Sequence, residues 1–150
     1  LSYPSADEEV EVMNRMDAGL YDKNNRSRPV VGLNDIRRLQ GIVRHVHMDR
    51  ALTRYASELV AVTRAPDEYL PRQLARLVEY GASPRATIAF VKSARALALL
   101  SGRAHVIPDD IAVLAHRVLR HRLILGFEAA SNGVTSEVIV DAVLQAVRVP

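Results

Sequence analysis

The chain lacks cysteine and tryptophan, and aromatic residues make up only 5% of its 150 residues. Without cysteine there is no disulfide framework and no thiolate chemistry, which favours a cytoplasmic location. No apolar run approaches the roughly 20 residues that a bilayer-spanning helix needs, so we expect no membrane association. There is no Gly-Lys pair to close a phosphate-binding P-loop, and no apolar strand ending in Asp-Glu to hold Mg²⁺. The chain alone is therefore not expected to hydrolyse ATP.

What is abundant points to packed helices. Alanine, leucine, valine and arginine dominate, and 49% of the residues are hydrophobic. We predict an all-α fold, a compact bundle of about six or seven helices. The formal net charge is +3, but the arginines are scattered, so the charge is only weak support for nucleic-acid binding. The chain begins at Leu1 rather than Met, and we interpret it as a piece of a longer protein.

The stretch Gly81-Ala82-Ser83-Pro84-Arg85 opens the helix around which the fold is expected to be organised. Ser83 suits the N-cap, Pro84 suits the first helical position, and Gly102 suits the end. Arg85 is unusual, since a cation in the first turn opposes the helix dipole. It becomes favourable where an anion binds, because helix N–H groups and a guanidinium can converge on one phosphate. The alternative is that Arg85 pairs with a carboxylate such as Glu79.

The same helix is apolar around most of its circumference, so we expect other helices to surround it. Its large apolar residues are Ile88, Phe90, Val91, Leu97, Leu99 and Leu100, and only a narrow line of Arg85, Ala89, Lys92 and Ala96 interrupts them.

Capping signals and apolar spacing place the other helices. Ser5 with Glu8 forms a capping box, and Asn34, Asp49 and Thr135 are expected N-caps. Pro108-Asp109-Asp110 starts a further helix. Residues 65–67 break one helix, Tyr69 to Tyr80 is predicted to form a short helix, Arg122 to Phe127 is either extended or a broken helix, and Ser131-Asn132-Gly133 is a turn. We divide the chain into residues 1–32, a connecting helix and linker, and a helical domain over 33–150.

Other candidate sites are weak. His45 and His47 lack a third ligand at a recognisable spacing, so no metal site is predicted. Asp109 and Asp110 suit a helix start better than an acid–base pair. Ser83 lacks an identifiable base, so no residue is predicted to be catalytic.

A basic cluster of Arg117, Arg120, His121 and Arg122 suits the negative end of a helix. It could also contact phosphates of a nucleic acid, which keeps a free-standing helical adaptor or nucleic-acid-binding domain as the alternative function.

The motif Gly81-Ala82-Ser83-Pro84-Arg85-Ala86-Thr87-Ile88 resembles the C-terminal helical lid of the MoxR family of AAA+ ATPases. Further likeness follows in order along nearly the whole chain. It includes Tyr3-Pro4-Ser5 with Glu8 and Glu9, Val46-His47 with Tyr55 and Leu59-Val60, Ala94 to Ala98 with Gly102-Arg103, Val106 to Ile111, and Val118 to Leu123. The Gly-Ala-Ser-Pro-Arg-Ala motif is the specific part, and the alanine-rich helices are less so.

The resemblance implies that Arg85, with Ser83 and Pro84, belongs to a nucleotide-binding site as the sensor-2 arginine, which reaches the γ-phosphate of ATP. It implies ATP and Mg²⁺ as cofactors of an intact ATPase whose Walker motifs lie in an N-terminal AAA+ core domain. It further implies a ring oligomer with chaperone-like activity on partner proteins, including ones with von Willebrand factor A domains. Nucleic acid is not an expected partner.

Overall fold

The computed structural model describes residues 3–20 and 29–150 of the chain. These residues form nine helices and two short strands, which confirms the predicted all-α class with more helices than expected. The chain divides into two units, Leu1–Arg37 and Arg38–Pro150, and the division falls inside one helix. A boundary after residue 32 stays a prediction. Across the described residues, no helix combines the length and apolar character needed to cross a membrane.

Helix α1 (Ala6–Asp17) begins at the predicted capping box. Glu8 accepts a hydrogen bond from the Ser5 backbone N–H at 2.7 Å, and the Ser5 hydroxyl accepts one from the Glu8 N–H at 3.4 Å. Each interaction spans three residues, so the helix start depends only on local sequence. The linker predicted within residues 1–32 lies largely in residues 21–28, outside the described residues.

Helix α2 (Leu33–Val43) begins earlier than predicted. Asn34 is not its N-cap. The Asp35 carboxylate instead accepts a hydrogen bond from the Gly32 N–H at 2.8 Å. A carboxylate in the first turn satisfies the exposed N–H group and also favours the positive end of the helix dipole.

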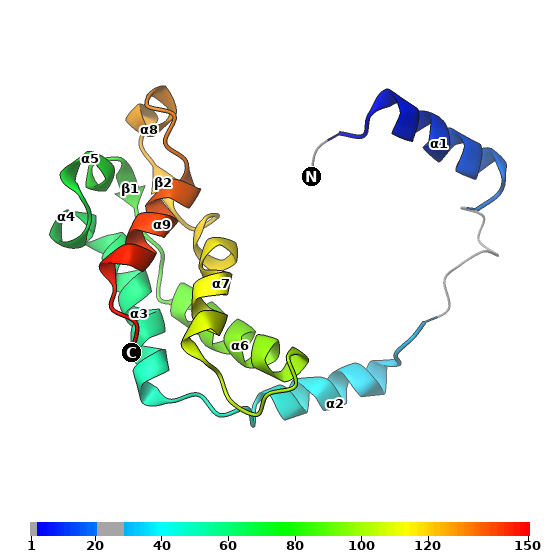
Figure 1. The fold of residues 1–150 in the computed structure, drawn as a ribbon, viewed down its shortest axis with the longest axis horizontal. Coiled ribbons are helices and arrows are strands. Elements are labelled where there is room, and N and C mark those ends of the chain that lie inside the picture. Colours follow the sequence, from blue (N-terminus) through cyan, green and yellow to red (C-terminus); the bar gives the residue numbers. More distant parts are fainter. Residues whose placement is uncertain (1–2, 21–28) are drawn as a thin grey trace. The chain divides into compact units, whose positions relative to one another are not determined.

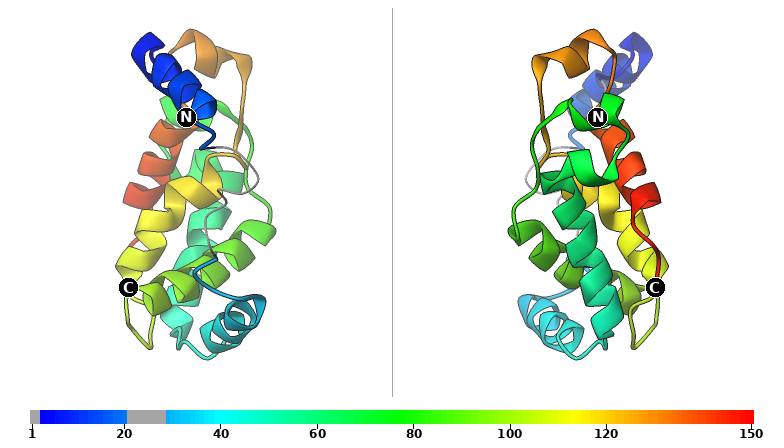
Figure 2. Two further views of the ribbon diagram at one scale, coloured as in Figure 1. Left: turned by 90° about the vertical axis from the view of Figure 1, so that its right-hand side faces the viewer. Right: turned by 90° about the vertical axis from the view of Figure 1, so that its left-hand side faces the viewer.

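Four helices enclose the core of the second unit (Figures 1 and 2): α3 (Arg50–Arg64), α6 (Arg85–Leu100), α7 (Pro108–Leu119) and α9 (Ser136–Ala146). Helix α6 packs against both α3 and α7, and α9 packs against α3 and α7. The largest fully buried side chains come from all four helices and are Leu59, Val60, Phe90, Ile111, Leu119, Ile139, Val140 and Val143.

The segment between α3 and α6 differs from the prediction. Asp49 caps α3 as expected, with its carboxylate accepting from the Ala51 N–H at 2.7 Å, and α3 ends at Arg64 before the predicted break. The predicted helix over Tyr69 to Tyr80 is wrong. The chain instead forms two single-turn helices, α4 (Pro66–Tyr69) and α5 (Arg72–Ala75), followed by strand β1 (Val78–Tyr80).

Strand β1 pairs in antiparallel fashion with β2 (Ile124–Leu125), which resolves the ambiguous segment after α7 as extended. Helix α8 (Phe127–Ser131) follows, and Gly133 takes a φ of 64° in the predicted turn before α9. Thr135 occupies the N-cap position of α9.

Helix α6 is not surrounded by other helices as predicted. Its buried residues are Ala86, Phe90, Ala94 and Ala98, which recur every four residues and so form a single stripe. On other sides of the helix, Ile88 is 55% exposed and Leu100 is 84% exposed. Small alanines on the buried stripe let the neighbouring helices approach closely, while part of the apolar surface stays open to solvent.

Candidate functional site

The predicted site residues Ser83, Pro84 and Arg85 are all exposed at the start of α6, directly after the loop that leaves β1. The Ser83 carbonyl accepts from the Ala86 N–H at 2.8 Å, and the Pro84 carbonyl accepts from Thr87 at 3.1 Å. The Ser83 hydroxyl makes no capping bond, and Pro84, whose backbone is already helical, is the N-cap. The predicted capping role of Ser83 is therefore wrong. The helix opens with a tight turn built on main-chain carbonyls.

Arg85 projects from the first turn of α6 without a partner among the residues that the structure describes. The alternative pairing with Glu79 is not formed. A guanidinium here adds charge to a helix end that already carries partial positive charge, so no local interaction offsets its placement. The position suits recognition of an anion supplied from outside this unit.

The loop that precedes Arg85 is held against the end of α3 by two close contacts. The Thr63 hydroxyl donates to the Val60 carbonyl at 2.6 Å and accepts from the Ala82 N–H at 2.9 Å. Beside it, Gly81 lies so near α3 that a Cβ added there would be 2.1 Å from the Thr63 carbonyl oxygen. Thr63 is fully buried, so this contact fixes where α6 begins and hence where Arg85 is presented.

We expect Thr63→Val to lower the free energy of unfolding by about 1–3 kcal/mol, because the isosteric change leaves the Ala82 N–H buried without an acceptor. Urea unfolding of the chain measures this. Thr53→Val is the matched control, since Thr53 lies exposed on the same helix and its hydroxyl donates only a long bond of 3.3 Å to Asp49. Equal stability of the two variants would contradict an anchoring role for Thr63.

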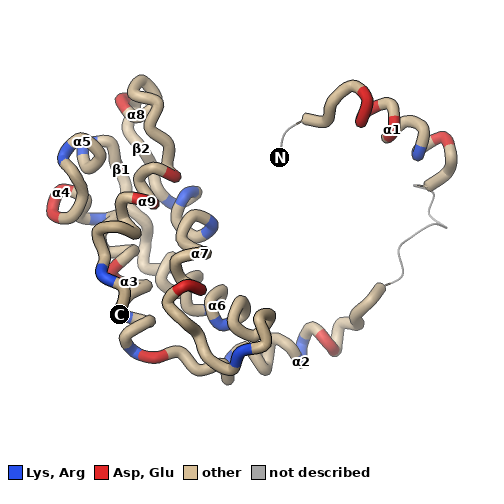
Figure 3. Tube along the Cα trace, in the orientation of Figure 1, with Lys and Arg blue, Asp and Glu red and all other residues tan. Residues whose placement is uncertain are grey.

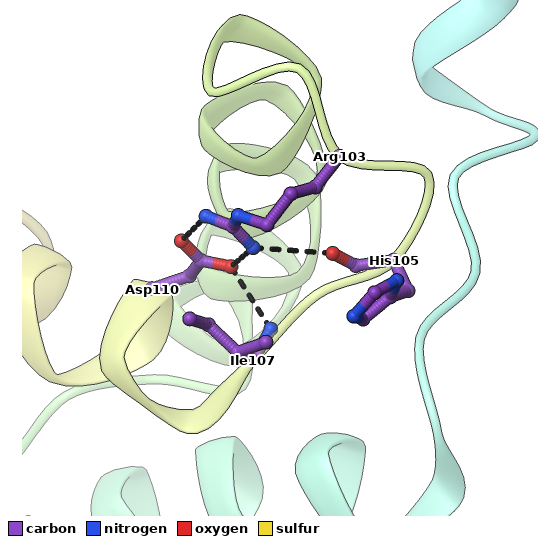
Figure 4. Close-up of polar contacts among 4 residues, drawn as sticks. All are labelled: Arg103, His105, Ile107 and Asp110. Carbon is purple, nitrogen blue, oxygen red and sulfur yellow. Dashed lines mark hydrogen bonds and ion pairs between the residues drawn. The ribbon is translucent and has the colours of Figure 1, made fainter.

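A second buried polar contact closes the loop between α6 and α7 (Figure 4). Arg103 donates two hydrogen bonds to the Asp110 carboxylate, at 2.7 and 2.6 Å, and a third to the His105 carbonyl at 3.2 Å. Asp110 also accepts from the Ile107 N–H at 2.9 Å. Hydrogen bonding to Arg103 is the main cause that holds the pKa of Asp110 below its ordinary value. Asp110 is thus a structural carboxylate, as the helix-start interpretation of Asp109 and Asp110 required.

Two histidines contribute to the scaffold, His47 through its backbone and His116 through its ring. The His47 backbone forms a bridge with the loop before α7, donating to the Ala104 carbonyl and accepting from the Val106 N–H, both at 2.9 Å. His116 lies 2.9 Å from the Asp141 carboxylate and joins α7 to α9. Within residues 3–20 and 29–150, no group of three or more His, Cys, Asp or Glu side chains gathers as metal ligands would.

The basic cluster at the end of α7 is partly engaged within the protein. Arg122 contacts the Val118 carbonyl and the His121 ring, and Arg120 lies 3.9 Å from Glu137. The Arg122 contact with the Val118 carbonyl caps the negative end of α7, whereas the Arg120 contact reaches the first turn of α9. Two of the three arginines in the cluster therefore have roles inside the bundle.

Thr63, Gly81 and Arg103 were not identified as site residues from the sequence. The sequence places Gly81 in the motif that opens α6 without giving it a role, although a glycine next to a predicted helix start is a signal for close backbone approach. Thr63 is a polar residue within an apolar helix end, and its partner is 19 residues away. That partner becomes visible only in the fold.

Comparisons with known proteins concern the family and the fold. Residues 74–143 match the family model of the AAA lid domain. The chain is 35% identical over 150 residues to chaperone MoxR1 of Mycobacterium tuberculosis and 37% identical over 153 residues to the uncharacterized protein YeaC of Bacillus subtilis. Both alignments include the whole chain, which covers 39% of the first relative and 43% of the second.

The crystal structure of a "putative ATPase" from Cytophaga hutchinsonii superposes on the whole chain with a TM-score of 0.85 at 33% identity, over 45% of its own length. The chain thus spans about two fifths of the length of these relatives. None of these findings supports a free-standing adaptor or a nucleic-acid-binding domain. Residues 74–143 are an AAA lid domain, and the chain belongs to the MoxR family of AAA+ ATPases.

Proposed function

We propose that this lid senses the γ-phosphate of ATP through Arg85 and couples its hydrolysis to movement of the lid. The observation that carries the proposal is the exposed guanidinium of Arg85, which has no acidic partner in the described chain and stands at the first turn of a helix anchored in the core. Guanidinium groups and helix N-termini both bind phosphate oxygens well. Arg85 is the contacting residue in this proposal, and Ser83 and Pro84 shape the turn that presents it.

Movement follows from a change in charge. With ATP bound, Arg85 and the positive end of α6 attract the terminal phosphate and draw the lid towards the domain that binds the nucleotide. Once the phosphate is lost, that attraction is lost as well. Because Thr63 and Gly81 fix the start of α6 to α3, a pull on Arg85 moves the helical unit as a rigid body.

The chemical step is assigned to an AAA+ core domain that works with this lid. The chain has no Gly-Lys pair for a P-loop, so ATP and Mg²⁺ would be held by the core, and Mg²⁺ would neutralise phosphate charge there. MoxR1 is named a chaperone. By analogy we propose that the intact protein forms a ring oligomer and remodels partner proteins, including ones with von Willebrand factor A domains. A cytoplasmic location stays a prediction.

The test is Arg85→Ala in the intact ATPase. Loss of one charged hydrogen-bond donor to the phosphate is expected to lower kcat/KM for ATP by roughly tenfold to a hundredfold. Arg85→Lys keeps the charge but loses the planar fork, so partial activity is expected. Arg72→Ala on α5 is the matched control, because Arg72 is also exposed and lies outside the site. Unchanged hydrolysis and unchanged ATP affinity in Arg85→Ala would contradict the proposed role.

A further inference from the structure

A cavity lies between the N-terminal part of α3 and residues 148–150, which follow α9. Its volume is about 380 Å³, within the range of roughly 300 to 1,000 Å³ of clefts that bind small molecules. Both segments line it, with Arg54, Tyr55, Glu58, Arg148, Val149 and Pro150. We call it the α3–tail cavity. In Figure 3, positively and negatively charged residues of α3 lie close to the C-terminal end of the chain.

The Tyr55 side chain points to a ligand in this cavity. Tyr55 is only 3% exposed, yet its hydroxyl forms no hydrogen bond with any residue that the structure describes. The hydroxyl is not sealed inside the core, because in the described chain Arg95 Nε is the one side-chain polar atom sealed off without a partner. Since Tyr55 lines the α3–tail cavity, its hydroxyl opens into it. Burial raises the pKa of Tyr55, so the hydroxyl stays protonated at neutral pH and can donate.

Arg148 gives the cavity its charge. It is exposed and forms no ion pair with a residue in the described part of the chain. The other two charged side chains of the lining neutralise each other, since Arg54 Nε lies 2.8 Å from the Glu58 carboxylate. The lining side chains therefore carry two positive charges and one negative charge, a net charge of +1. A ligand with a single negative charge complements them.

We propose that the α3–tail cavity binds a small organic carboxylate. The Arg148 guanidinium and the Tyr55 hydroxyl donate to the carboxylate oxygens, and Val149 and Pro150 contact the apolar body of the ligand. A doubly charged phosphate is a poorer ligand, because the Glu58 carboxylate lines the same cavity and like charges repel at close range.

This site is separate from the proposed nucleotide contact. The loop before Arg85 is anchored at Thr63, near the other end of α3. Tyr55 precedes Thr63 by eight residues, which correspond to about 12 Å along a helix. The carboxylate proposal therefore does not rest on the role of Arg85.

The first measurement is saturation-transfer NMR of the intact ATPase with three small molecules of similar shape, namely benzoate, benzamide and benzylamine. Excess ADP keeps them out of the nucleotide site. We expect benzoate to bind roughly fivefold or more tightly than benzamide, because hydrogen bonds to a charged acceptor are stronger. Benzylamine should bind most weakly, since its ammonium group meets Arg148. Equal binding of the three molecules, or no binding of benzoate, would overturn the proposal.

The second measurement uses variants of the two donors. Arg148→Gln is expected to weaken benzoate binding roughly tenfold or more, and Tyr55→Phe roughly threefold to tenfold. Benzamide binding should change little in Arg148→Gln, which separates lost charge recognition from a distorted cavity. Arg117→Gln and Tyr80→Phe are the matched controls, because both residues are exposed and lie outside the cavity. Unchanged benzoate affinity in Arg148→Gln, or an equal loss in the controls, would contradict the site.

Arg85→Ala distinguishes this proposal from the proposed function. Benzoate binding should be unchanged in Arg85→Ala, even where ATP hydrolysis is impaired. Loss of benzoate binding in that variant would overturn the proposal, because the anion would then bind at the nucleotide contact. Unimpaired hydrolysis in Arg85→Ala, with benzoate binding that depends on Arg148, would contradict phosphate sensing and support the α3–tail cavity.

Discussion

Replacing Gly81 by alanine is expected to lower the free energy of unfolding by about 3 kcal/mol or more, through a backbone clash. A Cβ at this position would lie 2.1 Å from the Thr63 carbonyl oxygen, 2.4 Å from the carbonyl carbon and 2.7 Å from the Arg64 nitrogen. All three atoms are main-chain atoms at the end of α3, so no side chain can rotate out of the way. The loop and the helix must separate, and the midpoint of urea unfolding should fall accordingly.

Gly41→Ala is the matched control for this prediction. A Cβ added to Gly41 would meet nothing within 4 Å, and Gly41 lies inside α2. Alanine there should be neutral or stabilise the helix by about 0.5–1 kcal/mol. If Gly81→Ala unfolded at the same urea concentration as the wild type, the close approach would not be a constraint, and the loop would be free to shift.

The Gly81 contact also connects stability to the proposed function. The same separation would stretch the hydrogen bond from Ala82 to Thr63, which is 2.9 Å long and holds the loop that leads to Arg85. Misplacement of a binding group by about 1 Å can cost a large factor in rate. In the proposed mechanism, Gly81→Ala therefore impairs ATP turnover even where enough folded protein remains.

Helix ends were predictable where the signal is local. Ser5 with Glu8 and Asp49 with Ala51 make their bonds over two or three residues, so a short window of sequence contains both partners. Gly102 ends α6 with a φ of 73°, a conformation that glycine adopts without strain. These elements would form in much the same way in any fold that placed them at a surface.

The helix predicted for the segment before α6 was wrong because the structure of this segment depends on distant residues. Leu70, Leu74, Leu77 and Val78 recur at helical spacing, yet Val78 pairs with Leu125 and Tyr80 with Ile124 across a two-stranded sheet. Apolar spacing over so few residues does not separate a helix from turns that bury the same side chains. Its partner strand, β2, lies within Arg122 to Phe127, the segment for which the sequence allowed either an extended strand or a broken helix.

The surroundings of α6 could not be obtained from its sequence either. An apolar circumference predicts that a helix is buried on all sides. Within α6, however, the fully buried residues form only the stripe through Phe90, and the Ile88 side chain is exposed to solvent. A helical wheel gives the chemistry of each side without saying which sides receive neighbours.

The sequence predicts Arg85 as a site residue because it breaks a local rule, a cation at the positive end of a helix. The groups that position it break no such rule. A threonine near the end of α3 is unremarkable until the fold brings the Ala82 N–H to its hydroxyl. Sequence thus indicated the group that is proposed to contact a ligand, and the structure was needed for the groups that hold it in place.

Removing the Asp110 carboxylate is expected to produce the other large loss of stability. Asp110 is only 4% exposed and receives two hydrogen bonds from Arg103 and one from the Ile107 N–H. Asp110→Ala leaves the guanidinium and this N–H without their acceptor, which should cost about 2–4 kcal/mol in urea unfolding. Asp109→Ala is the control, because Asp109 is exposed on the same first turn of α7 and contributes mainly through the helix dipole.

The same carboxylate predicts how stability depends on pH. The pKa of Asp110 is lowered in the folded state, chiefly by its hydrogen bonds with Arg103, so the folded state binds a proton less readily than the unfolded state. Its contribution is therefore complete above the unfolded-state pKa, near 4, and is lost as the pH falls through the lower folded-state value. Unfolding measured from pH 7 down to pH 3 should show a smaller acid-induced loss in Asp110→Asn than in the wild type. If both proteins lost stability in parallel, the ion pair in Figure 4 would not be the group that couples protonation to folding.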